Sequence, residues 1–513
     1  MTEAPGPGQW YATAEHMPAP GSTLLADLLP RVASGWADGT EAYGLPPNRA
    51  RFGFAGRWGY YSPGGPGVVD VVALDARAER VLADERWRAD LQRWHTEERP
   101  ALMAESHALL DDDLAALDTE SLAAHVRRAI DHYVRRGAEH FARMPIGSAA
   151  MGAFLQAAGE WGLDPRALLL AMPGSSAASR SGDHLLQRIR VGLHEAGLLH
   201  PRSLDEVRAV GGDAAAALHQ LERDYAWRAP QEISTPTLAE RPESLFAAVV
   251  AALAEPPRRD HPHDRALDAF REQVPAGERD RFDDLAAVAR DGYGHNDDNT
   301  VACFSLPLGL VRRAALEVAR RAGLADPADA VECTADELLA LVTGGGPAPS
   351  ELARRADERR AAANVVPPPV LGEPFPPEPE PDWGPSTRAL MAMIDAFSQV
   401  AWSRPSGDGA AATVGTQVVR GRALIVADPI EALARLEPDD ILVALTTTAV
   451  FNTIFPLVAG VAVEHGGFMG HAAILARELG LPAVIGVPGL LACVSDGDQI
   501  ELDPVAGTVT VLR

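Results

Sequence analysis

The stretch GVAVEHGGFMGHAAILARELGLPAVIGVPG, from Gly460 to Gly489, places a short apolar run before a glycine loop and then a helical pattern. We expect a strand that ends at Glu464 or His465 and a helix that begins at His471 and stops at Gly480. A strand, a glycine loop and a helix start form an anion site, because free backbone N–H groups and the helix dipole point at the loop. A neutral nitrogen of a histidine placed there can act as a nucleophile toward a phosphoryl group.

The residues around this stretch predict a small α/β domain that covers residues 413–513. Short runs rich in β-branched residues alternate with turn signals, which is typical of strands. The runs are TQVVRGRALIVA, DDILVAL, AGVAVEH, PAVIGV, DQIELDP and GTVTVLR.

The motif of two glycines followed by HAAILARELGLPAVIGVPG resembles the swivelling phosphohistidine domain of the phosphoenolpyruvate synthase, pyruvate phosphate dikinase and rifampin phosphotransferase family. The preceding segment LEPDDILVALTTTAVFNTIFPLVAGVAVE is similar as well, and the resemblance covers roughly residues 413–513. It implies that His471 carries a phosphoryl group. The bland alternative is a loop histidine without a phosphoryl role.

Other residues of the loop and helix are candidates for phosphate binding. They are Gly466, Gly467 and Gly470 in the loop and Arg477 on the helix. Arg477 is expected either to reach the phosphate oxygens or to be a solvated helix residue. The family usually has Ser, often after Thr, just before the histidine, whereas Met469 and Gly470 stand here. The change removes one hydroxyl that could donate to the phosphate.

The chain before residue 363 predicts a mainly α-helical substrate domain with a partly irregular opening. From about residue 100 to 360, apolar residues recur at intervals of three and four residues, with Asp, Ser or Thr near the expected helix starts and Gly near the expected helix ends. The opening contains RFGFAGRWGYYSPGGPG from Arg51 to Gly67, whose Gly/Pro cluster interrupts the periodicity. Its aromatic residues either line a substrate pocket or belong to the core; they are Trp58, Tyr60 and Tyr61.

A proline-rich segment, residues 363–412 with a short helix near Ser386 to Ser398, separates these two domains. Its prolines leave no scope for a helix or a central strand from Ala363 to Pro385. In polyproline geometry roughly twenty residues span about 60 Å, enough for a following domain to change partners. An extended strap packed on the helical domain is the alternative. The expected fold is therefore multidomain, a large helical domain followed by a small α/β swivelling domain.

Two helical-region segments resemble the substrate domain of rifampin phosphotransferase-like proteins. In LERDYAWRAPQEISTPTLAERPESL, Arg228 remains where the family has an Arg, and we count it among the phosphate-binding candidates. In the second segment, GHNDDN packs charged residues into an expected loop before a helix. Paired carboxylates beside a histidine can provide a base that deprotonates a substrate hydroxyl. The candidates are His295, Asp297, Asp298 and, for substrate binding, Asn299; ordinary helix capping is the alternative.

The amino-acid composition of the chain limits which binding partners and cofactors we expect. The net charge of −25 argues against nucleic acid and anionic membranes, because both need a positive surface field. All 46 basic residues are arginine, so there is no P-loop or Schiff-base lysine. The N-terminus MTEAPGPGQW lacks the pattern of a signal peptide, and the three cysteines fit no metal spacing, so we expect a cytoplasmic protein without a bound metal.

The resemblance implies an incomplete dikinase, because nothing here is similar to the ATP-grasp domain that precedes the substrate domain in complete relatives. We therefore expect a separate ATP-grasp protein, with Mg²⁺ held by that partner, to charge His471 from ATP. The carrier would then deliver the phosphoryl group to a hydroxyl of a small molecule, for example a secondary metabolite, with or without later loss of phosphate as a dehydration. A non-catalytic regulatory or ligand-binding relative is the second hypothesis.

Overall fold

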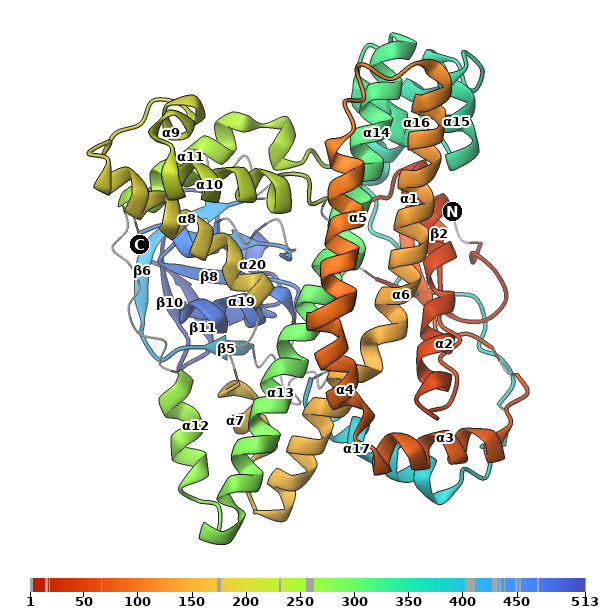
Figure 1. The fold of residues 1–513 in the computed structure, drawn as a ribbon, viewed down its shortest axis with the longest axis vertical. Coiled ribbons are helices and arrows are strands. Elements are labelled where there is room, and N and C mark those ends of the chain that lie inside the picture. The colour runs from red at the N-terminus through yellow and green to blue at the C-terminus, as the bar shows by residue number, and fades with distance from the viewer. Residues whose placement is uncertain are drawn as a thin grey trace. The chain divides into compact units, whose positions relative to one another are not determined.

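The computed structural model of the chain (Figure 1) describes residues 3–512 with short gaps. The gaps are 14–16, 18, 66, 173–176, 230–231, 255–262, 378, 402–410, 427–431, 433–434, 438, 448–450, 452–453 and 468–469. Of residue 471 only the backbone is described. No helix of this described part is long and apolar enough to cross a bilayer.

The chain divides into two units, each built from three separate segments. The first unit comprises Met1–Ile146, Trp227–Pro236 and Asn299–Ala392. The second comprises Gly147–Ala226, Thr237–Asp298 and Met393–Arg513. The predicted boundaries at 362 and 412 follow sequence composition and stay a prediction.

The core of the first unit is helical. Leu24, Leu28 and Val32 of its first helix are almost fully buried, and Ser22 caps that helix by accepting from the Leu25 N–H. The helices are α1 (Thr23–Val32), α2 (Ser34–Ala42), α3 (Val71–Ala83), α4 (Arg86–Arg93), α5 (Arg99–Asp111), the start of α6 (Thr119–Glu160), α14 (Leu306–Ala322), α15 (Ala335–Val342), α16 (Pro349–Ala362) and the start of α17 (Pro385–Ala401).

The opening of the chain is more regular than the sequence predicts. A four-stranded sheet has the order β2-β3-β1-β4, with β1 (Trp10–Ala12), β2 (Arg51–Ala55) and β3 (Trp58–Ser62). Gly56 and Arg57, both with positive φ, form the two-residue hairpin turn between β2 and β3. These strands were not predicted because the glycines within them interrupt the alternation of apolar and polar residues. A Cβ on Gly53 would lie 2.8 Å from the Trp10 ring, so glycine is required by close packing here.

The proline-rich segment is an extended strap on the first unit, the second of the two alternatives. Its strand β4 (Val370–Leu371) pairs with β1 in an antiparallel register that places Leu371 opposite Trp10. The Tyr60 hydroxyl donates to the Pro368 carbonyl at 3.0 Å, and Trp383 is buried. Prolines are tolerated there because an edge strand leaves one row of N–H groups unused.

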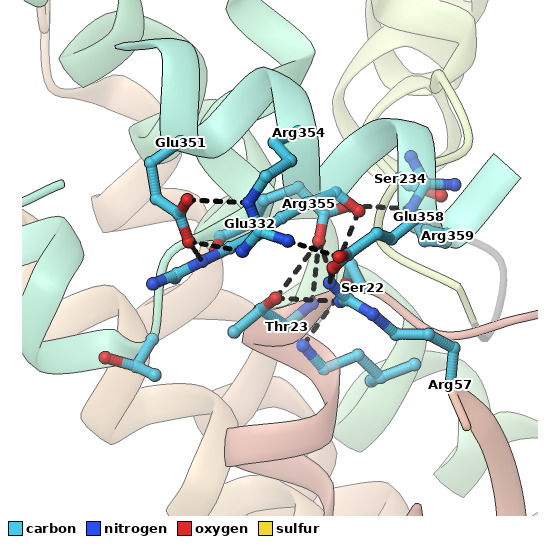
Figure 2. A network of polar contacts seen from close by, with 12 residues as sticks. Ser22, Thr23, Arg57, Ser234, Glu332, Glu351, Arg354, Arg355, Glu358 and Arg359 are labelled. Carbon is cyan, nitrogen blue, oxygen red and sulfur yellow. Dashed lines mark hydrogen bonds and ion pairs between the residues drawn. The ribbon is translucent and has the colours of Figure 1, made fainter. Parts of the chain in front are cut away.

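A polar network joins distant segments of the first unit (Figure 2). The Glu332 carboxylate is fully buried and contacts Arg57 at 3.0 Å and Arg359 at 2.6 Å. It also accepts from the Thr23 hydroxyl at 3.1 Å. A buried carboxylate is stable only when its charge is paired and its oxygens are hydrogen-bonded, and both conditions hold here.

The helices of the second unit form two apolar clusters. One is centred on Phe154 and Phe282, and the other on Ile189 and Leu218. The helices are the rest of α6, α7 (Pro165–Leu170), α8 (Ala177–Glu195), α9 (Leu204–Val210), α10 (Gly212–Leu221), α11 (Pro242–Ala254), α12 (His263–Arg271), α13 (Arg279–Thr300) and the rest of α17.

The C-terminal part of the second unit is a seven-stranded sheet of order β11-β10-β6-β7-β8-β9-β5 (Figure 1). Strands β6 to β9 are parallel neighbours, and the others pair antiparallel. The six predicted runs are confirmed as β6 (Val419–Ile425), β7 (Ile441–Ala444), β8 (Gly460–Val463), β9 (Ala483–Ile485), β10 (Gln499–Asp503) and β11 (Thr508–Val511), whereas β5 (Ala412–Val414) was not predicted.

The central strands of this sheet are buried on both faces, as parallel strands usually are. In β7, Leu442 packs into the core on the face of the sheet that is covered by α19 (His471–Leu479). Val443 packs on the opposite face. The predicted fold class, a large helical part followed by a small α/β domain, is confirmed.

Candidate functional site

The glycine loop follows the carboxyl end of the buried parallel strand β8. The His465 N–H donates to the Leu445 carbonyl at 2.7 Å, which continues the pairing of β8 with β7 by one residue. The Glu464 carboxylate accepts from the Leu491 N–H at 2.8 Å. In α/β sheets this carboxyl edge is the usual place of ligand binding.

The loop turns in a small space. A Cβ on Gly466 would lie 2.8 Å from a side-chain carbon of Ile485 in the neighbouring strand. The Gly470 N–H donates to the Gly467 carbonyl at 3.0 Å, and a Cβ on Gly470 would lie 3.2 Å from the Gly467 nitrogen and oxygen. Nothing lies within 4 Å of a Cβ on Gly467, so the fit is tight at two of the three predicted glycines.

The helix α19 (His471–Leu479) begins and ends where the sequence predicts. Gly470 is its N-cap with φ −67° and ψ 154°, and Gly480 ends it with φ 63°. Because Gly470 has no side chain, the first N–H groups of α19 receive no side-chain cap from it. Residues 468–469 and the side chain of His471 lie outside the described residues, so the predicted phosphoryl-carrier role of His471 stays a prediction.

The helix α19 has two buried faces. Ala473, Leu475 and Ala476 belong to the core beneath the sheet. Ile474 instead packs on the helical cluster that contains Phe154 and Phe282. At 100° per residue, positions 471, 474 and 478 share this second face. The helix that begins at His471 therefore packs on helices of the second unit by the face on which position 471 lies.

Arg477 is buried against the helix α13. Only 2% of its surface is exposed, so the prediction of a solvated residue is wrong, because the helix packs on others at this position. Its guanidinium interacts with the buried Tyr293 of α13 and with Glu478, while burial lowers the pKa of Arg477 below its ordinary value. Burial raises the pKa of Tyr293, although Arg477 opposes that shift. Whether Arg477 contacts a phosphate stays a prediction.

The GHNDDN segment is not a loop. It lies inside α13, so the predictions of a loop and of helix capping are both wrong. The reason is close helix packing: a Cβ on Gly147 of α6 would lie 2.7 Å from the Gly292 carbonyl and 2.5 Å from the Asn296 amide oxygen. Such tertiary contacts override the weak helix propensity of Gly, Asn and Asp.

The predicted catalytic residues on α13 differ in accessibility. His295 and Asp298 are buried, whereas Asp297 is half-buried. Asp297 lies one turn after Tyr293 and raises its pKa, so the two interact. Tyr293, which no sequence motif singles out, thus interacts both with Arg477 on the carrier helix and with the candidate base.

Arg228 and Asn299 belong to the first unit. Arg228 is 7% exposed, in a segment that lies directly on α14, where a Cβ on Gly309 would be 1.5 Å from the Trp227 carbonyl oxygen. The Asn299 amide donates to the His140 carbonyl at 3.0 Å. Their predicted roles in phosphate and substrate binding stay predictions.

The three aromatic residues of the opening segment lie on different faces of β3, because successive side chains of a strand alternate between its two faces. Trp58 and Tyr60 are buried in the core with Trp10, so the core alternative holds for them. Tyr61 points to the other face of β3, is half-buried, and stacks edge-on with Trp36 at 5.9 Å between ring centroids.

Comparison with known proteins agrees with this site. Residues 436–507 match the family model of the PEP-utilising enzyme mobile domain. This part of the chain therefore belongs to the family of PEP-utilising enzyme mobile domains. The matched residues include the glycine loop and all of α19.

Several known proteins are similar to parts of this chain. A rifampicin phosphotransferase of a Streptomyces species is 30% identical over 332 residues, which cover 60% of this chain and 36% of the relative. The enzyme of the same name from Streptomyces sviceus is 40% identical over 108 residues, 21% of this chain and 12% of the relative. The prodigiosin synthesizing transferase PigC of Serratia marcescens is 34% identical over 105 residues, 20% and 12% respectively. The chain thus spans little more than a third of the first of these relatives.

Proposed function

We propose that the chain is a phosphotransferase component that carries a phosphoryl group on His471 and delivers it to a hydroxyl of a small-molecule acceptor. The observation that carries this proposal is the position of His471 as the first residue of α19, after a glycine loop at the carboxyl edge of parallel strands. Free N–H groups and the helix dipole favour a phosphoryl group there. The match to a PEP-utilising mobile domain supports the same assignment.

Two displacement steps make up the proposed reaction. First, a neutral ring nitrogen of His471 attacks the phosphorus of the donor, a P–N bond forms, and the P–O bond to the leaving group breaks. Second, the acceptor oxygen attacks the phosphorus, the P–N bond breaks, and a base takes the hydroxyl proton. Asp297 is the proposed base because it is the half-buried carboxylate of the α13 segment, with Asp298 as the alternative and His295 beside them.

The packing of α19 supports the delivery step. Ile474 and Arg477 contact the helical part of the second unit, and Arg477 interacts with Tyr293, one turn from Asp297. The face of α19 on which position 471 lies therefore meets the helices that carry the candidate base. Delivery needs such an approach of carrier and acceptor site.

The donor and the setting are also part of the proposal. ATP is the phosphoryl source, a separate ATP-grasp protein charges His471, and Mg²⁺ is held by that partner. The acceptor is a small molecule, as in secondary metabolism, and not a nucleic acid or a membrane. If phosphate leaves the product in a later elimination, the net reaction is a dehydration. The protein acts in the cytoplasm.

The test is the intact mass of the chain after incubation with ATP, Mg²⁺ and a candidate ATP-grasp protein. One acid-labile phosphoryl group is expected on the wild type and on His465→Ala, and none on His471→Ala. His465 is the matched control because it lies in the same loop, before α19. Labelling of His471→Ala would refute the carrier assignment.

The second candidate function, a non-catalytic regulatory or ligand-binding relative, is favoured by the absence of a capping side chain at Gly470. It predicts that no partner and no nucleotide labels His471, although the chain still binds its ligand.

A further inference from the structure

Strand β11 forms one edge of the seven-stranded sheet in the second unit (Figure 1). It pairs antiparallel with β10, and no described strand pairs with its other side. Along β11 the side chains alternate, so that Thr508 and Thr510 are exposed, whereas Val509 and Val511 are only partly buried against the core. The strand therefore presents a row of backbone groups and the uncovered part of two valine side chains to the outside.

The hydrogen bonds between β11 and β10 show which backbone groups of β11 are directed outward. The Leu512 N–H donates to the Gln499 carbonyl at 2.8 Å, so Leu512 and, two residues before it, Thr510 turn their backbone groups toward β10. In an antiparallel pair such residues alternate with residues whose N–H and C=O groups point away from the partner. Val509 and Val511 are therefore the residues whose backbone groups point outward from the sheet.

The edge at β11 lacks the features that usually protect an edge strand. Charged residues, prolines and short length keep such strands from pairing with other chains. The segment PVAGTVTVL, residues 504–512, contains no charged residue although 23% of the chain is charged, and its proline precedes the strand. The opposite edge, β5, is by contrast three residues long, with Ala412 and Val414 buried. The edge at β11 is thus the one suited to a further strand.

The sequence of β11 is complementary to itself in an antiparallel pair. When Thr510 lies opposite Thr510 of a second copy, Val509 lies opposite Val511 of that copy, and the converse holds for the other valine. The outward N–H and C=O groups of these valines then all form hydrogen bonds across the contact. Pairs of threonine and of β-branched residues stabilise antiparallel neighbours, and no like charges lie opposite each other.

We propose that β11 pairs with β11 of a second copy of this chain, and so joins two sheets edge to edge about a two-fold axis at Thr510. Such a contact uses the same surface on both copies and closes after two. In the sheet order, β10, β6 and β7 separate β11 from β8, the strand that leads to the glycine loop. The contact is made away from that strand, and the proposal does not depend on phosphoryl transfer by His471.

The net charge of the chain gives this contact a characteristic salt dependence. Each copy has a formal net charge of −25, so two copies repel each other at low ionic strength. Salt screens that repulsion, and the uncharged segment 504–512 holds no ion pair that salt could weaken. A single pair of short strands buries little surface, so we expect a weak dimer with a dissociation constant on the order of 10 μM.

Sedimentation velocity of the full chain over a concentration series tests the proposal. The wild type should change from monomer to dimer, and the midpoint concentration should fall when NaCl is raised from about 0.05 M to about 0.5 M. A monomer up to about 200 μM at both salt concentrations, well above the expected midpoint, would overturn the proposal. Assembly beyond the dimer would do so as well, because a two-fold contact closes at two copies.

Charged substitutions at Thr510 locate the contact. Because this side chain is exposed, Thr510→Lys and Thr510→Glu should keep the melting temperature of the wild type, and each places like charges opposite each other on the two-fold axis. Each variant alone should dimerise roughly fivefold more weakly than the wild type, the value of about 1 kcal/mol. An equimolar mixture of the two variants should dimerise again, since opposite charges then meet at the axis.

The matched control is Val505→Lys in the turn before β11, where Val505 is 72% exposed and lies outside the contact. It changes the net charge as Thr510→Lys does, and it should dimerise at least as well as the wild type. A general charge effect would strengthen association in both lysine variants, whereas pairing at Thr510 weakens it in only one. Wild-type association of both Thr510 variants, or a mixture of them that stays monomeric, would refute the pairing.

Discussion

Arg477 of α19 and Tyr293 of α13 are buried against each other in the second unit. An arginine is rarely buried unless its charge is compensated, and here the neighbours are a phenol and the Glu478 carboxylate. The pair fixes which face of the carrier helix meets the helical segment.

Arg477→Met should therefore destabilise the chain markedly. Removing the guanidinium takes away the hydrogen bond to the buried Tyr293 and a positive charge near the buried Glu478, and loss of a buried hydrogen bond to a charged group commonly costs about 1.5–3 kcal/mol. The control is Arg420→Met, since Arg420 pairs with Glu501 on an exposed strand, where pairs contribute less than about 1 kcal/mol. Urea unfolding of both variants gives the comparison, and equal losses would contradict the burial argument.

Asp297→Asn should leave phosphoryl capture on His471 intact and slow delivery. The amide cannot accept the hydroxyl proton, and loss of a positioned base commonly lowers a rate about a hundredfold or more. The phosphorylated form should then accumulate in an intact-mass time course with an identified acceptor. Asp284→Asn, an exposed carboxylate of the same helix, is the control and should turn over normally. Normal turnover of Asp297→Asn would move the base elsewhere.

Glu332→Gln should destabilise the first unit. The buried carboxylate of Glu332 balances the positive charges of Arg57 and Arg359 (Figure 2). An uncharged amide would leave both guanidinium groups without this negative charge. A loss of about 3 kcal/mol in the free energy of unfolding is expected for a broken buried network. Glu358→Gln serves as the control, because its side chain is 52% exposed and should lose much less. A chemical denaturation series that finds no difference would show that the network is not needed for stability.

The stability of the first unit should fall as the pH is lowered from 7 to 5. Burial lowers the pKa of His132 and of His140 to about 4, whereas an unfolded chain protonates histidine near pH 6.5. Since the unfolded state then binds more protons, stability is present above pH 6.5 and is lost toward the folded pKa, by about 1–2 kcal/mol per histidine in this window.

The variant His132→Asn should flatten this pH dependence. Urea unfolding at several pH values checks it, and the control is His107→Asn, whose ring is only partly buried on the neighbouring helix α5. An unchanged slope in His132→Asn would contradict the assignment of the pH dependence to this ring.

Gly470→Ser should strengthen the start of α19. The φ and ψ of Gly470 lie in the extended region that serine adopts at N-caps, and its hydroxyl would accept from the Ala473 N–H. A gain of about 0.5–1 kcal/mol is expected, reduced by the 3.2 Å approach of the new Cβ to Gly467. Gly467→Ser, where a Cβ meets nothing, should give no such gain in thermal unfolding. A loss of thermal stability in Gly470→Ser would show that the loop cannot shift to make room for the new side chain.

The sequence predicts the elements whose signals are local. The strands β7 and β8 and the limits of α19 follow from alternating apolar runs and from glycines at the helix ends. The segment around Asp297 was assigned wrongly because its helix is enforced by packing on Gly147, far away in the chain. The Arg477–Tyr293 pair joins distant segments, and local patterns contain no information about such contacts.

The strap also governs when the first unit can finish folding on the ribosome. Chains emerge from the N-terminus, so β1 leaves the ribosome long before its partner β4. Until Leu371 arrives, the outer edge of β1 presents unpaired backbone groups, which other chains can pair with. Translation of the strap is therefore the event that closes this edge, and a pause before it would extend the time in which the nascent chain is prone to aggregate.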